Sequence, residues 1–362
     1  MKYIASLVLV LFFTVSGVYG ETLEPSRIPS LISSTRIKAP VDFCSEAVPL
    51  GNQKVRERME KELLLTLWDR PQIILWMKRS KRYLPLIETM LAKHHLPDDL
   101  KYISVIESAL RPHVGSPKGA LGFWQFMSST GRKYGLTVDR EIDDRRNIFA
   151  ATRSAIDYLK DLHEKFGSWT LAAAAYNMGE QGLEAEILSQ ATDNYYDLYI
   201  PLETQRYMFR ILSAKLILSS PQKYGFILKP QDYYAPLQYD RIEIHMDQQT
   251  PIQLIARAAK TTFKTIKDLN PEIRGYHIRK GNYNILIPKD SAKGFEKRLN
   301  ALQKQWQSNE QKKIHVVKDG ENLSTIAELY KVPLPALLIW NRLNPSKPIH
   351  PGNRLIIAPP IK

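Results

Sequence analysis

The sequence predicts an α+β protein of several domains, in which an all-helical domain precedes two small βααβ modules. Apolar residues recur at three- and four-residue spacings from about residue 48 to 225, and short β-type strings bracket helices after that point. Two later segments also match each other in one register without gaps. A chain of 362 residues exceeds one ordinary domain, so a multidomain architecture agrees with the length.

The helical domain is predicted over residues 47–226. The strings that carry its pattern are VRERMEKELLLTLWD, YLPLIETMLAKHH, DDLKYISVIESAL, ATRSAIDYLKDLHEKF, TLAAAAYNMG and ETQRYMFRILSAKLIL. Residues 21–46, before this domain, are rich in Ser, Pro and charge without a sustained period, and we expect a mobile lead-in there.

The two βααβ modules are predicted over residues 241–289 and 313–360. Their alignment pairs Asn270 with Asn341 and Gly281 with Gly352 without a gap, which indicates two copies of one unit. In the second copy IHVVKDG and RLIIAPP are strand-like, while NLSTIAELYK and LPALLIWNRLN are helix-like. Residues 290–312 are polar with weak helical periodicity, and we expect a linker there.

The first twenty residues have the layout of a secretory signal peptide, with Lys2, an apolar stretch and small residues before Glu21. An uncleaved N-terminal anchor is the alternative. No other run reaches the roughly 18 apolar residues that a membrane span requires. We therefore expect an exported protein, periplasmic or otherwise associated with the cell envelope, and peripheral association with membrane or wall fits this expectation.

The charge of the chain limits its possible binding partners, and its cysteine content limits the possible disulfides and metal sites. The formal net charge of +14 favours anionic surfaces, and export favours a carboxylate-rich cell wall over nucleic acid, which we do not expect as a partner. The single cysteine, Cys44, excludes an internal disulfide and a cysteine metal site. We expect no metal and no cofactor, because His94 and His95 are adjacent and point apart on a helix and no phosphate-binding loop occurs. The sequence leaves the oligomeric state open.

Glu107 lies within an apolar helical run, one turn after Ile103. A carboxylate in such surroundings is costly when charged, so its pKa rises and it stays protonated near neutral pH, as a general acid requires. An exposed glutamate at a helix end is the alternative that position alone allows. Pro112 ends the run, and three glycines follow in GSPKGALG, where the backbone must approach a neighbour closely.

These segments resemble the family 1 lytic transglycosylases, particularly the membrane-bound lytic murein transglycosylase D-like enzymes with a goose-lysozyme-like domain. The matching elements are the pair Glu107 and Ser108, then Ser116, then GFWQFM, and later AAYNMGE. Met178 departs from the alanine that the last element has in that family. The resemblance covers roughly residues 47 to 226 and implies a lysozyme-like catalytic domain.

The resemblance implies a lyase that cleaves the β-1,4 bond between N-acetylmuramic acid and N-acetylglucosamine in peptidoglycan. Glu107 would protonate the leaving oxygen and then take the proton of the muramoyl 6-hydroxyl, which attacks C1 and forms a 1,6-anhydro end. Most glycosidases use two carboxylates, and the acids nearest to the matched motif lie after it in a predicted loop. The residues expected to contact substrate are Ser108, Ser116, Gln125, Met127, Tyr176 and Asn177.

The βααβ modules resemble LysM domains, which bind glycans containing N-acetylglucosamine. In that family the sugar groove lies between two loops, and the corresponding positions in the second copy are Asp319, Gly320, Glu321, Asn322 and Leu323, then Asn344, Pro345, Lys347, Pro348 and Ile349. The first copy has Gln249 in the place of Gly320. We expect it to be a degenerate LysM-like module.

Two alternatives to a peptidoglycan lytic transglycosylase remain at this point. A lysozyme-like muramidase would share the fold and Glu107 but would release reducing ends. A catalytically silent peptidoglycan-binding protein would keep the folds without activity. The complete set of matching elements argues against silence, and the lack of a second acid in the motif argues against simple hydrolysis.

Overall fold

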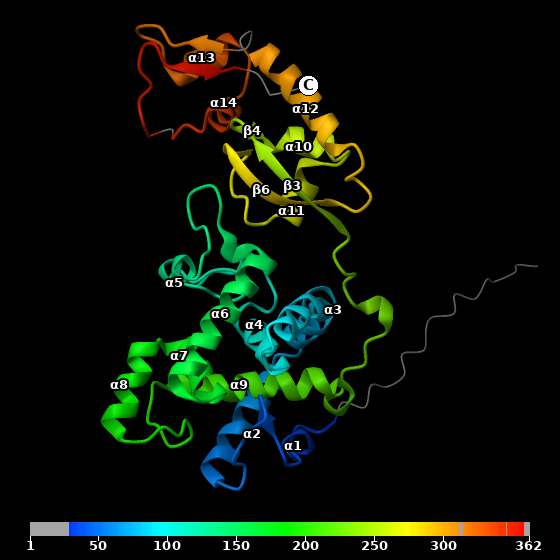
Figure 1. Ribbon diagram of the computed structural model, residues 1–362, viewed down its shortest axis with the longest axis vertical. Helices are drawn as coiled ribbons and strands as arrows, with labels where there is room; N and C mark the ends of the chain where they lie inside the picture. The colour runs from blue at the N-terminus through cyan, green and yellow to red at the C-terminus, as the bar shows by residue number, and fades with distance from the viewer. Residues whose placement is uncertain (1–28, 311–313, 345, 358–362) are drawn as a thin grey trace, which may run out of the picture.

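The computed structural model describes residues 29–310, 314–344 and 346–357. The predicted signal peptide over residues 1–20 and the start of the predicted lead-in lie outside these residues. A helical domain is followed by two smaller units, and each of the three has its own cluster of buried apolar side chains (Figure 1). The predicted fold class is confirmed. Within the described ranges, no helix is long and apolar enough to cross a membrane.

The helices of the first domain pack around one core in which α9 contacts α2, α4 and α7. Side chains cap the N-termini of several of these helices. Asn147 accepts hydrogen bonds from two backbone N–H groups at the start of α6, and Ser168 accepts one at the start of α7. The elements are α1 (Leu31–Ser34), α2 (Gln53–Trp68), α3 (Arg70–Lys93), η1 (Asp98–Leu100), α4 (Lys101–Ser108), α5 (Ser128–Lys133), η2 (Asp144–Arg146), α6 (Ile148–Phe166), α7 (Trp169–Met178), α8 (Glu180–Gln190), α9 (Leu202–Ser219), η3 (Pro221–Tyr224) and η4 (Pro230–Asp232).

The prediction of a mobile lead-in is wrong for its described C-terminal part. Strands β1 (Asp42–Phe43) and β2 (Glu46–Ala47) form a small hairpin, and Phe43 is fully buried in the core of the helical domain. The Glu46 carboxylate accepts hydrogen bonds from the backbone N–H groups of Trp169 and Thr170 at the start of α7. The hairpin docks because Glu46 satisfies helix N–H groups that have no partner within the helix.

The first LysM-like module is built on the antiparallel pair β3 (Tyr239–Met246) and β6 (Gly281–Pro288), whose register runs from Tyr239 opposite Pro288 to Met246 opposite Gly281. Its helices are α10 (Ile252–Ala258) and α11 (Phe263–Leu269), and two short strands, β4 (Thr250–Pro251) and β5 (His277–Ile278), pair beside them. The second module has β7 (Ile314–Val316), α13 (Leu323–Leu329), α14 (Leu334–Asn341) and β8 (Arg354–Ile356).

An asparagine at the equivalent position of each module makes the same set of hydrogen bonds. The side-chain amide of Asn270 donates to the carbonyls of Ile266 and Leu286, and its oxygen accepts from the Leu286 backbone N–H. Asn341 makes the same three bonds, to Leu337 and Ile356. The shared hydrogen bonds explain why these two asparagines align in the repeat, because each one joins the last turn of a helix to the closing strand.

Most of the predicted linker is instead a helix, α12 (Phe295–Glu310). Phe295, Leu299 and Trp306 are buried in the core of the first LysM-like module, and α12 packs against α10. Their spacing of four and seven residues places all three on one face of the helix. The weak periodicity of this polar segment therefore comes from a narrow apolar stripe that covers the first module.

The catalytic domain and the first module are joined by backbone pairing. Ile142 and Ile273 form an antiparallel bridge, the Asp143 N–H donates to the Glu272 carbonyl at 2.9 Å, and the Arg274 N–H donates to the Glu141 carbonyl at 2.7 Å. The Glu141 carboxylate also pairs with Arg279 at 3.2 Å and with Arg342 of the second module at 2.7 Å. Glu141 thus contacts both modules from the catalytic domain.

Candidate active site

Glu107 lies in the last turn of α4, a short helix whose remaining residues are all buried. The helix ends because Ala109 and Leu110 both adopt left-handed backbone conformations, with φ of 52° and 58°. Left-handed residues terminate a helix, so the chain turns away directly after Glu107. Part of the Glu107 side chain stays accessible, while its carboxyl group is surrounded by protein atoms.

The Glu107 carboxyl group accepts a hydrogen bond from the hydroxyl of Tyr207, a residue of α9 that is 2% exposed. Burial raises the pKa of Glu107 to about 7, against the opposing effects of this hydrogen bond and of the positive charge of Arg210. The negative charge of Glu203 adds to the increase. A carboxyl group with this pKa can both donate and accept a proton at neutral pH.

The loop that faces α4 is organised by Arg145. Its guanidinium pairs with Asp143 and donates to the carbonyls of Gly119 and Phe126 at 2.9 and 3.0 Å. Gly122 has a φ of 83°, and a Cβ at this position would lie 1.8 Å from the Arg145 carbonyl oxygen. The sequence predicts a close backbone approach at the glycines of GSPKGALG, and this is confirmed at Gly122, where no other residue fits.

Several predicted substrate contacts have side chains that bond within the protein. Ser108 is 2% exposed and its hydroxyl donates to the Phe123 carbonyl at 2.8 Å, so the prediction that it contacts substrate does not agree with its placement. Tyr176 donates to the Trp124 carbonyl at 2.7 Å. Asn177 accepts from the Thr204 hydroxyl at 2.8 Å and so ties the end of α7 to the start of α9.

The other three predicted contacts keep groups available. The amide N–H groups of Gln125 donate to the carbonyls of Val114 and Gly122, which leaves the amide oxygen free to accept. Ser116 accepts from the Ala120 N–H at 3.1 Å and is partly exposed. Met127 is 42% exposed, so its thioether side chain is available for contact with a sugar face.

The acidic residues after the motif are engaged elsewhere. Asp143 forms a buried ion pair with Arg145 at 2.9 Å, and Asp144 accepts from the Thr137 N–H at 2.9 Å. Glu141 joins the catalytic domain to both modules, as described above. Glu203 is the acidic residue whose charge acts on Glu107, and its side chain is exposed on the first turn of α9.

In the second module several of the predicted sugar contacts serve the local fold. The Glu321 carboxylate pairs with His315 at 2.6 Å, and the Asn322 side chain accepts from the Ser324 and Thr325 N–H groups at the start of α13. Leu323 and Ile349 pack against the small core, and the side chain of Asn344 accepts from the Ser346 N–H. Pro345 lies outside the described residues, and the exposed members of the set are Asp319, Gly320, Asn322, Asn344, Lys347 and Pro348.

The corresponding loops of the first module are joined to each other. Strands β4 and β5 pair Thr250 with Ile278 and Pro251 with His277, and the Ile252 N–H donates to the Tyr276 carbonyl at 2.9 Å. These hydrogen bonds hold the two loops together.

Three family models match the chain in the order of its structural units. They are described as a transglycosylase SLT domain over residues 85–198, the LysM-like domain of lytic transglycosylase MltD over residues 240–304, and a LysM domain over residues 315–358. The first match contains Glu107 and its facing loop. The chain is a lytic transglycosylase. The resemblance predicted from the sequence is confirmed.

The lytic transglycosylase is similar to curated proteins along most of its length. It is 28% identical to the membrane-bound lytic murein transglycosylase D of Escherichia coli strain K12 over 333 residues, which cover 87% of this chain and 72% of that protein. The protein of that name from E. coli O6:H1 gives the same values. Among solved structures, the 70 kDa soluble lytic transglycosylase of E. coli matches with 18% identity and a TM-score of 0.36, over 49% of this chain and 30% of that chain.

Sequence reasoning did not reveal the roles of two residues of this site. Tyr207 carries the hydroxyl that meets Glu107, and Arg145 holds the loop that faces α4. Only the spacing of Tyr207 on an apolar helix face could have placed it near the core, and that spacing does not show which side chain its hydroxyl contacts. Arg145 lies in a segment without periodicity, so its burial had no signal in the sequence.

Proposed function

We propose that this lytic transglycosylase cleaves the β-1,4 bond between N-acetylmuramic acid and N-acetylglucosamine in peptidoglycan and leaves 1,6-anhydromuramoyl ends. The observation that carries the proposal is the half-buried Glu107, with a pKa of about 7 and a hydrogen bond from Tyr207, at the edge of a glycine-rich loop. Glu107 first acts as the general acid that protonates the leaving oxygen. The same carboxylate then takes the proton of the muramoyl 6-hydroxyl as that oxygen attacks C1.

The carboxylates around the site support a one-acid mechanism. An ordinary glycosidase places a second carboxyl group at the reacting carbon. The acids that follow the motif are held by Arg145, Thr137 and the two modules, so the substrate's own 2-acetamido group stabilises the cationic centre and its 6-hydroxyl serves as the nucleophile. The exposed Glu203, whose charge acts on Glu107, would favour a muramidase instead.

The basic chain and its LysM domain support a function at the cell wall. A net charge of +14 suits a carboxylate-rich polymer, and the exposed loop residues of the second module are available for glycan. Tethering through this module raises the local concentration of glycan strands at the catalytic domain. We place the mature protein in the cell envelope, exported by the N-terminal signal.

Digestion of purified sacculi in ¹⁸O-labelled water tests the reaction. A lytic transglycosylase releases 1,6-anhydromuramoyl products that contain no solvent oxygen, which mass spectrometry identifies. A hydrolase incorporates one water oxygen in each cut. Labelled, reducing muramic acid as the main product would show that the chain is a muramidase, with Glu203 as the first candidate for its second acid.

A further inference from the structure

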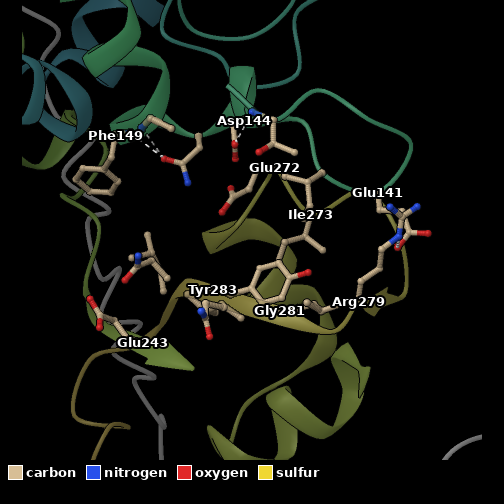
Figure 2. Close-up of a pocket in the computed structure, with 18 of the residues that line it drawn as sticks. Glu141, Asp144, Phe149, Glu243, Glu272, Ile273, Arg279, Gly281 and Tyr283 are labelled. Atoms are coloured by element: carbon tan, nitrogen blue, oxygen red, sulfur yellow. Dashed lines mark hydrogen bonds and ion pairs between the residues drawn. The ribbon is translucent and has the colours of Figure 1, made fainter. Parts of the chain in front are cut away.

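A cavity of about 670 Å³ lies between the catalytic domain and the first LysM-like module and contains neither Glu107 nor Tyr207 (Figure 2). One wall comes from the segment 137–153, which includes the start of α6. The other comes from β3, β6 and residues 272–278. Because the two domains are joined by the pairing of residues 141–143 with 272–274, the cavity is bounded by a fixed junction.

Glu272 points into this cavity and is 6% exposed (Figure 2). The Asn147 side chain donates to its carboxyl group, while its Oε2 has no hydrogen-bond partner among the residues that the structure describes. Burial raises the pKa of Glu272 to about 7, and the negative charge of Asp144 adds to this increase while the positive charge of Lys267 opposes it. A buried carboxylate oxygen without a donor costs free energy, so this end of the cavity favours a group that brings a positive charge.

Exposed basic side chains line the rim of the cavity, beside the exposed carboxylates of Asp139 and Glu243. Arg153 of α6 and Arg241 of β3 are both exposed, and the Arg241 guanidinium lies 4.2 Å from the centre of the Phe149 ring. Within the described ranges, Arg153 has no ion-pair partner. The cavity therefore has a buried acidic end and exposed arginines on its rim, a combination that suits a ligand with an ammonium group and a carboxylate.

We propose that this cavity binds a short zwitterionic wall peptide, with its ammonium group at Glu272 and its carboxylate at the rim arginines. The choice of a wall peptide rests on the proposed function, whereas the charge pattern comes from the cavity itself. An uncharged sugar would bring no positive charge to the unpartnered Oε2 of Glu272 and so fits less well. The site would hold the peptide side of the wall while Glu107 acts on the glycan.

Isothermal titration of the full chain tests the site with two matched peptides. Nα-acetyl-L-lysyl-D-alanyl-D-alanine carries a free ε-ammonium group and a carboxylate, and the Nα,Nε-diacetyl form differs only in lacking the ammonium charge. At pH 8 most of Glu272 is ionised, since its pKa is about 7. We expect the first peptide to bind at least about tenfold more tightly than the second, the usual effect of a charge-assisted hydrogen bond.

Two substitutions test the residue assignment. Glu272→Gln should weaken binding of the first peptide at least about tenfold and abolish the difference between the peptides. Glu243→Gln is the matched control, because this exposed carboxylate lines the same cavity on β3. It should change the affinity less than about twofold. A thermal melt of each variant establishes that both remain folded.

Equal affinities for the two peptides, absence of binding, or unchanged binding by a folded Glu272→Gln variant would overturn the site. The titration uses no cleavage step, so its failure is distinguishable from failure of the proposed reaction. Glu107→Gln should still bind the first peptide with wild-type affinity. Loss of binding in that variant would place the peptide at Glu107 and also overturn the proposal.

Discussion

Replacement of Glu107 by glutamine should stabilise the catalytic domain, and the gain should depend on pH. Burial raises the pKa of this carboxyl group to about 7 from its ordinary value of 4.5. Between these two values the folded protein holds a proton that the unfolded chain has released. The stability due to the protonated carboxyl group is therefore fully present below pH 4.5 and is lost as the pH rises through 7.

The size of the effect follows from the shift. Each pKa unit corresponds to about 1.4 kcal/mol, so ionisation of Glu107 costs up to about 3 kcal/mol at pH 8. Glutamine has the same shape and its amide oxygen can still accept from Tyr207, but it carries no charge. For a domain of this size, the melting temperature should rise by roughly 6–12 °C at pH 8 and change little at pH 4.5.

Differential scanning calorimetry at both pH values measures this difference. Glu203→Gln is the control, since it removes an exposed negative charge near the same site and should change the melting temperature only slightly at either pH. A gain of the same size at both pH values, or no gain at pH 8, would refute the reasoning from burial. The variant should also lose sacculus cleavage by at least about 10²-fold, because glutamine cannot transfer a proton.

Three further predictions follow. Tyr207→Phe should move the alkaline limb of the pH–rate profile upwards by about one to two units, because the lost hydrogen bond favours the ionised Glu107. Tyr195→Phe, which removes another buried hydroxyl, should leave that limb in place. Gly122→Ala should lower the free energy of unfolding by at least about 2 kcal/mol in urea titrations, whereas Gly119→Ala, with open space for a Cβ, should lower it less; equal losses would contradict the close approach to Arg145. Removal of residues 311–362 should reduce pull-down by sacculi more than cleavage of short soluble glycans, since only the insoluble polymer benefits from tethering. Equal reductions would mean that the second module supports the catalytic fold.

The fold class and the repeat were accessible from the sequence because both depend on local patterns. Three- and four-residue spacing of apolar side chains identifies a helix face whatever lies against it. The alignment of Asn270 with Asn341 can also be recognised in the sequence, because each copy needs one side-chain amide to join a helix to its closing strand. The order of the catalytic elements around Glu107 was enough to find the family.

The polar segments were harder to predict. The lead-in has no period, yet its hairpin is fixed by Phe43 in the core and by Glu46 at the start of α7. The segment that includes Trp306 has only a weak apolar stripe, and its helix is stable because the first module covers that stripe. The surface against which such a short apolar patch packs is set by the tertiary structure and cannot be predicted from the local sequence.

The sequence by itself determined the helical catalytic domain, the two βααβ modules and Glu107 as the candidate acid. The tertiary structure decided that Tyr207, 100 residues further along the chain, donates to that acid. It also decided that Ser108 faces inward and that Glu272 faces a cavity between two domains. Periodicity records which face of an element is apolar, but the pairing of polar groups distant in sequence depends on how the elements pack.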